Sequence, residues 1–293
     1  MAKKFAYMSQ NEWLGDPTTH FMKSGSTIRS PANKAQEALA NLLPRVVNGV
    51  KVEYDIAYDN PHEVSGYKFS DFLTNALYIG PQSGRISTEV IAEVASRPAT
   101  EEGYAIFDKL RDSMEDKYIL DEDFDAEIDT IVVLPGTNLL SREDTVDFDK
   151  IDQLVREGAY VKIHPITERT WEASLRQRWG KQVIGSDVSL YPILRACNRV
   201  MFTMSSETGL AATLLGKKIG LIDHPKKKAF STFQHLYGGM DRARNGSLRE
   251  RFSSLLSHPE SGILTTYHKN PEERIRAFFE FMTKYPHKKM PIQ

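Results

Sequence analysis

The chain of 293 residues has one cysteine, no apolar run of bilayer length and no glycine-rich GxGxxG fingerprint. The single Cys197 excludes an internal disulfide and suits a reducing cytoplasm. Its apolar helical surroundings favour a buried structural thiol over a nucleophile. No apolar stretch approaches the roughly 20 residues of a membrane span. Because Met1–Lys4 leads directly into the strand-like Phe5–Met8, we expect neither a signal peptide nor a membrane span, and a cytoplasmic location.

The composition is that of a globular protein, with 40% hydrophobic and 26% charged residues. A chain of this length accommodates two ordinary domains. An acidic run, Asp121–Asp129, has the composition of a linker, although an acidic metal cluster is the alternative interpretation. We therefore expect an N-terminal α/β domain over residues 1–125 and a C-terminal domain over residues 126–293.

Charge is unevenly distributed although the formal net charge is only −1. Residues Pro225–Gln293 contain thirteen Lys or Arg against six Asp or Glu. The simplest interpretation is a solvated face, and the alternative is a site for a polyanion such as DNA. The candidate residues for such an acceptor site are Lys227, Arg242 and Arg244.

The clearest pattern lies within Val161–Asp223. Arg199–Met204 is an apolar strand followed at once by two serines, which favour helix N-caps. Leu210, Leu214 and Leu215 then recur at helical spacing, and Gly216 supplies a stop. The next apolar run, Ile219–Ile222, completes a strand–helix–strand crossover, the unit of a parallel sheet.

Strands and helices alternate through the rest of the C-terminal half, which predicts a Rossmann-like domain. The expected strands are Ile131–Leu134, Tyr160–Ile163, Gln182–Ile184, Val200–Thr203 and Ile219–Ile222. The expected helices are Phe148–Arg156, Arg169–Trp179, Leu190–Cys197 and Pro271–Tyr285, the last of which is expected to cross back to the N-terminal domain.

The N-terminal half is less regular. We predict strands at Phe5–Ser9 and Val50–Ala57, a strand end at Tyr78–Pro81, and helices at Ala35–Val47, Thr88–Ala95 and Glu101–Met114. A polar loop follows the first strand, where open α/β sheets place ligands. Asp16 and His20 in this loop are the candidates for proton transfer, although loop acids and histidines are common without function.

Polar residues follow several strands of the predicted parallel sheet. His164 closes one strand after Lys162, and Ser205 and Ser206 close another. Where a helix begins directly after such a strand, the free N–H groups of its first turn and the positive end of its dipole attract an anion. The remaining candidates for a phosphate and ribose site are Gly136 and Thr137, in the turn after Ile128–Leu134, and Glu207.

A strand ending in His-Pro and a later strand ending in Ser-Ser at a helix start resemble the donor half of GT-B glycosyltransferases. Bacterial sialyltransferases, Kdo-type capsule transferases and glycerophosphotransferases share this pattern. The resemblance implies that His164, Ser205 and Ser206 hold the phosphate of a nucleotide-sugar donor, in two Rossmann-like domains that face a cleft. It covers roughly Ile128–Asp223. Small phage-encoded enzymes that glycosylate DNA bases use the same two-domain architecture.

The resemblance implies a glycosyltransferase that needs neither a metal nor a cofactor. No DxD motif occurs in a suitable strand-end loop, which disfavours a GT-A enzyme with a metal-bridged donor. The expected partners are a nucleotide sugar and a polymeric acceptor, either a surface glycan or a hydroxylated DNA base. The alternatives are a non-catalytic protein that binds nucleotides or nucleic acid, and a nucleotide-sugar epimerase.

Overall fold

We describe a computed structural model of the chain. The structure describes residues 38–39, 42, 52–54, 67–73, 75–81, 83–114, 127–141, 145–165, 167–225, 232–243 and 246–285. Within these residues no helix is both long enough and apolar enough to span a membrane.

The chain forms two compact units. The described residues of the first unit lie within Ala35–Lys109 and Phe230–Gln293, and those of the second lie within Leu110–Ala229. The C-terminal segment therefore groups with the N-terminal half of the described chain, as expected for the last helix. The division at residue 125 stays a prediction, as does the cleft implied by the resemblance.

The second unit contains a five-stranded sheet in which every pair of strands is parallel. The strand order is β6-β5-β4-β7-β8. This confirms the α/β class and the parallel sheet predicted for the C-terminal half. The strands are β4 (Thr130–Val133), β5 (Tyr160–Lys162), β6 (Val183–Ile184), β7 (Arg199–Phe202) and β8 (Lys218–Leu221).

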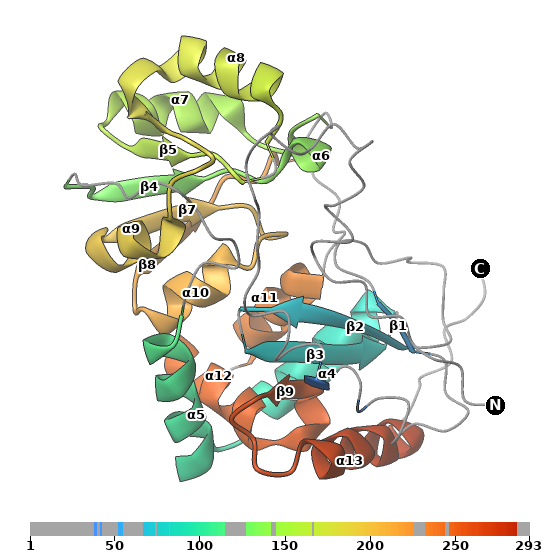
Figure 1. Ribbon diagram of the computed structural model, residues 1–293. Helices are drawn as coiled ribbons and strands as arrows, with labels where there is room; N and C mark the ends of the chain where they lie inside the picture. Colours follow the sequence, from blue (N-terminus) through green and yellow to red (C-terminus); the bar gives the residue numbers. More distant parts are fainter. Residues whose placement is uncertain are drawn as a thin grey trace. The chain divides into compact units, whose positions relative to one another are not determined.

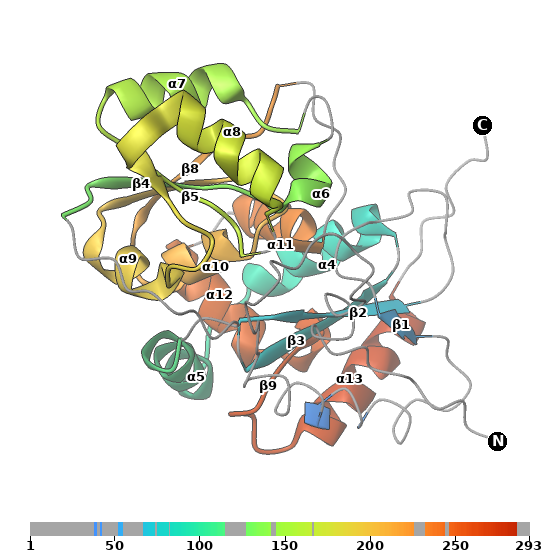
Figure 2. The same cartoon turned by 45° about the horizontal axis from the view of Figure 1, so that its top comes forward.

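Helices cover both faces of this sheet (Figures 1 and 2), with α7 and α8 on one face and α9 and α10 on the other. The core under α7 and α8 joins Val132, Val161 and Met201 of the sheet to Ile151 and Leu175 of the helices. Burial on both faces explains why the central strands β4 and β7 appear as continuous apolar runs in the sequence. The helices are α6 (Thr137–Leu140), α7 (Phe148–Arg156), α8 (Arg169–Trp179), α9 (Leu190–Ala196) and α10 (Thr208–Leu214), and a 3₁₀ turn, η1, spans Gly180–Gln182.

Helix ends in the second unit follow local sequence signals. The Asp147 side chain caps α7 by accepting a hydrogen bond from the Lys150 amide at 3.0 Å. Gly158 follows the end of α7 with a φ of 100°, and Gly216 follows α10 with a φ of 65°. Both glycines adopt the positive φ that disfavours other residues, and the helix stop predicted at Gly216 is confirmed.

The first unit contains a mixed sheet of order β1-β2-β3-β9, formed by β1 (Val52–Tyr54), β2 (Tyr67–Phe72), β3 (Ala76–Pro81) and β9 (Ile263–Thr265). Strands β1 and β2 are parallel, whereas β2 with β3 and β3 with β9 are antiparallel. The chain reverses between Phe72 and Ala76, too short a connection for a parallel crossover. The described part of this sheet therefore differs from the parallel sheet of a Rossmann domain.

Helices lie on both faces of the mixed sheet. Helices α4 and α11 lie side by side on one face and α13 lies on the other (Figure 2). On the α13 side, the Tyr67 ring of β2 meets the Phe278 ring edge-on. The helices of this part are α4 (Gly84–Ala95), α5 (Glu101–Asp112), α11 (Thr232–Arg242), α12 (Leu248–Ser257) and α13 (Pro271–Lys284), and a 3₁₀ turn, η2, spans Pro259–Ser261.

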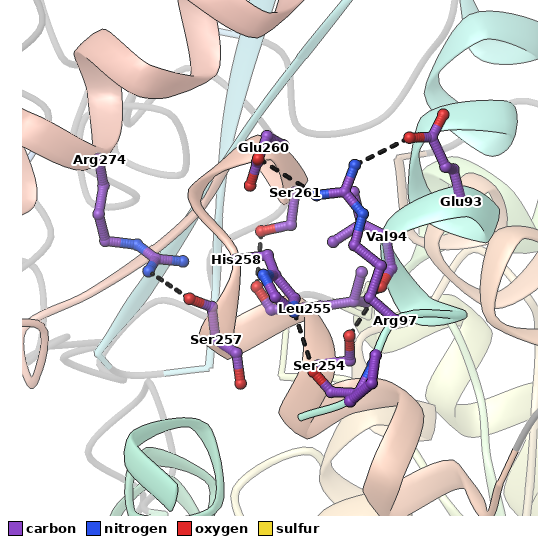
Figure 3. Close-up of polar contacts among 11 residues, drawn as sticks. Glu93, Val94, Arg97, Ser254, Leu255, Ser257, His258, Glu260, Ser261 and Arg274 are labelled. Atoms are coloured by element: carbon purple, nitrogen blue, oxygen red, sulfur yellow. Dashed lines mark hydrogen bonds and ion pairs between the residues drawn. The ribbon is translucent and has the colours of Figure 1, made fainter. Parts of the chain in front are cut away.

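Polar contacts fasten the C-terminal helices to α4 (Figure 3). Ser254 of α12 donates a hydrogen bond to the Val94 carbonyl at 2.7 Å. Arg97, just beyond α4, pairs with Glu93 at 2.8 Å and with Glu260 at 3.2 Å. Segments more than 150 residues apart in the sequence thus share one core.

Candidate functional site

The carboxyl ends of all five parallel strands meet at one edge of the second unit's sheet. The chain runs from β4 outward to β5 and β6, and then returns to β7 on the other side of β4. Such a reversal creates a topological switch point, the place where open α/β sheets bind ligands. The residues after β4 and β7 flank this point, and those after β5 lie one strand away.

The turn after β7 carries the Ser-Ser motif. The Ser206 amide donates to the Thr203 carbonyl at 2.8 Å, which closes the turn. The Ser205 and Thr203 hydroxyls lie 3.1 Å apart. Ser206 accepts a hydrogen bond from the Thr208 amide at 3.2 Å. Both serine side chains are half-buried at the edge of the sheet.

The predicted N-cap position is corrected by this turn. Helix α10 begins at Thr208 with Glu207 as its N-cap, and the Glu207 side chain forms no capping bond. The turn uses the residues between strand and helix, so the serines lie just before the helix and not at its cap. Glu207 places a half-buried carboxylate beside them.

The segment after β4 forms a short helix where a tight turn was predicted. Gly136 is the N-cap of α6, with φ −67° and ψ 169°, an extended conformation open to any residue. Thr137 is 4% exposed, and its hydroxyl oxygen accepts a hydrogen bond from the Glu168 amide at 2.8 Å. Thr137 therefore joins the segment after β4 to the segment after β5.

The end of β5 holds Lys162 and His164 in different environments. Lys162 is 2% exposed, and its ammonium group donates to the Ile163 carbonyl at 2.6 Å and to the Gly185 carbonyl at 2.8 Å. These bonds tie β5 to the residues after β6. His164 is half-buried, and its carbonyl accepts a hydrogen bond from the Thr167 amide at 2.9 Å. His164, rather than Lys162, presents a partly exposed side chain.

Sequence reasoning did not identify Asp223, which follows β8. Its carboxylate accepts a hydrogen bond from the Met204 amide at 2.8 Å. A polar residue directly after the apolar run Ile219–Ile222, on the strand next to the Ser-Ser strand, was the available signal.

The remaining candidates lie elsewhere. Asp16, His20, Lys227 and Arg244 lie outside the described residues. Arg242 is exposed at the end of α11, in the first unit. The predicted phosphate-site residues therefore lie at the ends of β4, β5 and β7 or in the segments that follow these strands, and their roles, like those of the predicted base and acceptor residues, stay predictions.

Cys197 is fully buried, and burial raises the pKa of its thiol above the usual value. The expected structural thiol is confirmed. Within the described parts of the chain, no three His, Cys, Asp or Glu residues are placed to hold a metal ion.

Together these features define an α/β protein with a doubly wound parallel sheet and polar residues gathered at its switch point. No protein-family model and no curated protein sequence matches the chain significantly. Among solved structures, the chain is similar to Thermosulfurimonas dismutans KpsC, described as a beta Kdo 2,7 transferase, at 14% identity and a TM-score of 0.40. The match covers 70% of this chain and 80% of that chain. Similarity at this level assigns neither fold nor function.

Proposed function

We propose that this protein is a metal-independent glycosyltransferase whose second unit binds a nucleotide-sugar donor at the carboxyl edge of the parallel sheet. One observation carries the proposal. The strand order puts the residues after β7 at the switch point and the residues after β5 on the other side of β4, so His164 and the Ser205–Ser206 pair follow the two strands that flank β4, at the same edge of the sheet. The same two motifs carry the resemblance to GT-B donor domains.

In this proposal the donor phosphate lies between the two motifs. The His164 imidazole and the Ser205 and Ser206 hydroxyls donate hydrogen bonds to phosphate oxygens, and the Ser206 hydroxyl rotates to do so from the Thr208 hydroxyl, to which it donates at 2.9 Å. Hydrogen bonds to a charged group are stronger than neutral ones. Glu207 accepts from the ribose hydroxyls, and Thr137 holds the segments after β4 and β5 together. Lys162 contributes positive charge rather than a direct contact, because two carbonyls already bind its ammonium group.

The transfer step follows from this placement. The bond between the sugar and the donor phosphate breaks, and the phosphate leaves with the electron pair. Donors fixed in advance at that phosphate stabilise its growing negative charge, which is a large catalytic term. The acceptor hydroxyl bonds to the sugar and gives its proton to a general base. Asp16, with His20 sharing or orienting its role, is the candidate base.

The proposed acceptor is a hydroxyl of a surface glycan or of a modified base in DNA. Lys227, Arg242 and Arg244 are the candidate contacts for a DNA acceptor. Binding of DNA weakens steeply with added salt because counterions are released, whereas binding of a neutral glycan does not. Salt dependence of acceptor binding therefore separates the two acceptors.

The first test is ligand binding. Thermal unfolding is measured with a panel of UDP, CMP, CDP and GDP sugars, because a ligand at one hundred times its dissociation constant adds about 2.7 kcal/mol of stability. We expect His164→Ala and Ser206→Ala to lower the affinity for the stabilising donor by at least about tenfold, since a hydrogen bond to a charged group is worth about 1.5–3 kcal/mol. Isothermal titration calorimetry measures this loss.

Ser174→Ala is the matched control, because Ser174 is exposed on α8 and donates only to the Thr170 carbonyl within its own helix. Its donor affinity should equal that of the wild type. If His164→Ala and Ser206→Ala also bind as the wild type does, the donor site lies elsewhere. Release of free nucleotide only with acceptor present distinguishes transfer from simple binding, and an altered donor without acceptor indicates an epimerase.

A further inference from the structure

Asp223 lies where two neighbouring strands separate. Strands β7 and β8 pair in parallel up to Phe202 and Leu221. The Ile222 amide extends the pairing by donating to the Phe202 carbonyl at 3.0 Å. At Thr203 the β7 chain turns toward Ser206, and the regular pairing of the two strands does not continue to the Met204 amide. The Asp223 carboxylate instead accepts the Met204 amide hydrogen bond at 2.8 Å.

The main chain on either side of Asp223 is held by a different segment. Asp223 forms an isolated antiparallel bridge with Val146. The Asp147 amide donates to the Ile222 carbonyl at 2.9 Å, and the His224 amide donates to the Thr145 carbonyl at 3.2 Å. This segment joins α6 to α7, and so belongs to the connection that begins with Gly136 and Thr137 after β4.

Asp223 is held by two contacts, the main-chain bridge to Val146 and the side-chain hydrogen bond from the Met204 amide. Ile222 is fully buried, and Val146 is 6% exposed, so the bridge is part of the core. A hydrogen bond from a main-chain amide to a carboxylate is charge-assisted and short. Asp223 therefore fixes the turn that carries Ser205 and Ser206 relative to the connection that follows Gly136 and Thr137.

We propose that Asp223 is a positioning residue of the donor site, which holds the Ser205–Ser206 turn against the β4–α7 connection through the Met204 amide. The proposal rests on the function proposed above. A carboxylate repels a phosphate, so Asp223 acts on the donor through the turn and not by direct contact. The positions of the two serine hydroxyls depend on Asp223, because the residues that support substrate-binding groups fix where those groups lie.

The test compares Asp223→Ala, Asp223→Asn and Asp187→Ala. Alanine removes the acceptor for the Met204 amide, whereas the asparagine side-chain oxygen accepts the same hydrogen bond. Asp187 is the matched control, a half-buried acid in the segment after β6. Within the described residues, no hydrogen bond joins the Asp187 side chain to the Ser205–Ser206 turn. Circular dichroism and amide exchange in β4 and β5 establish that each variant is folded.

The first readout needs no ligand. Hydrogen exchange at the Met204 amide should speed up by at least about tenfold in Asp223→Ala and stay within about threefold of the wild type in Asp223→Asn and Asp187→Ala, since a lost hydrogen bond of ordinary strength corresponds to roughly a tenfold change. Unchanged exchange in Asp223→Ala overturns the proposal. So does equally fast exchange in the Asp187→Ala control.

The second readout is the affinity for CMP, UDP, CDP and GDP by calorimetry. For the nucleotide that binds the wild type, Asp223→Ala should lower the affinity by about tenfold and Asp223→Asn should restore it to within about threefold. Equal binding by wild type and Asp223→Ala, with Ser206→Ala impaired, overturns the positioning role alone. If the wild type binds none of these nucleotides, the proposed function fails and Asp223 positions no donor site.

Discussion

His268, in the first unit, shows how burial fixes the state of one side chain. The Thr265 amide donates to its Nδ1 atom at 2.9 Å, so Nε2 carries the hydrogen and donates to the Leu256 carbonyl at 2.9 Å. The residue is 6% exposed. Burial, with a smaller contribution from the positive charge of Arg274, lowers the pKa of His268 from 6.5 to about 4. The folded protein therefore holds this imidazole neutral.

This shift predicts a pH dependence of stability. Between about pH 6.5 and pH 4 the unfolded chain binds a proton at His268 that the folded chain does not, so stability falls as the pH falls through this window. The full effect is on the order of 3 kcal/mol for a shift of this size. Urea unfolding at intervals from pH 7.5 to 4 measures it.

His268→Asn is the matched variant, because its side-chain oxygen can accept from the Thr265 amide while the Leu256 bond is lost. We expect it to be less stable than the wild type at pH 7.5 by about 1–3 kcal/mol, since a buried carbonyl loses its donor. Its stability should fall less steeply between pH 6.5 and pH 4. A variant that keeps the whole wild-type slope would rule out His268 as the source.

At the scale of elements, α4 and α11 pack closely because of one glycine. A Cβ atom built on Gly239 would lie 2.6 Å from Ile91 Cβ and 3.0 Å from the Thr88 carbonyl oxygen, both on α4. A Cβ on the adjacent Gly238 would meet only the Thr88 Cγ2 atom, at an ordinary 3.8 Å. The two positions thus differ in the room available for a side chain, although both are in the same helix.

The pair gives a prediction with its own control. Gly238→Ala should leave stability unchanged or raise it by up to about 1 kcal/mol, because alanine favours the helical conformation more than glycine does. Gly239→Ala should lower stability by about 1–3 kcal/mol, since the methyl group forces α4 and α11 apart. Denaturant unfolding of both variants measures the difference. Equal stability of the two would contradict the close packing at Gly239.

Local signals in the sequence predict the elements of the second unit well. The apolar run Ile131–Leu134 indicates a strand buried on both faces, and Asp147 and Gly158 mark the two ends of α7. The mixed sheet of the first unit was not predicted, because Tyr67–Ile79 is rich in apolar and aromatic residues on both sides of its turn and has no glycine or proline at that turn.

Some residues of the candidate site can be predicted from the sequence, and the contacts of others cannot. His164 and Ser205 are found from sequence because each directly follows an apolar run. The partners of Lys162 and Asp223 are not, because both depend on which strands are neighbours: the Gly185 carbonyl belongs to the segment after β6, and the Met204 amide to that after β7. Strand order is a tertiary property that hydrophobic periodicity does not encode.

At the scale of the whole molecule, the chain leaves the first unit near Lys109 and returns to it near Phe230. Strand β9 completes the first unit's sheet by pairing with β3. Phe278 of α13 is 1% exposed and meets Tyr67 of β2 with a ring-centroid distance of 5.9 Å. The C-terminal segment is therefore part of the first unit's core, and the contact-defined units do not follow chain order.

This arrangement predicts which regions unfold together. Phe278→Leu weakens the core of the first unit and should lower its stability by about 1–2 kcal/mol. Ile131→Val, at a fully buried position in β4, should cost the second unit about 0.5–1.5 kcal/mol. Local opening occurs in contiguous cooperative units, so each variant should speed amide exchange mainly in its own unit. Hydrogen exchange followed by mass spectrometry at low denaturant measures this region by region.

The two variants distinguish contact-defined units from a division at residue 125. If the units follow contacts, Phe278→Leu speeds exchange in β2, β3 and α4 and leaves β4, β5 and β7 unchanged, while Ile131→Val does the reverse. If cooperative domains instead follow chain order, Phe278→Leu speeds exchange in β4, β5 and β7 and spares β2 and β3. Because β3 is hydrogen-bonded to β9 and α4 is hydrogen-bonded to α12 through Ser254, we expect the first pattern.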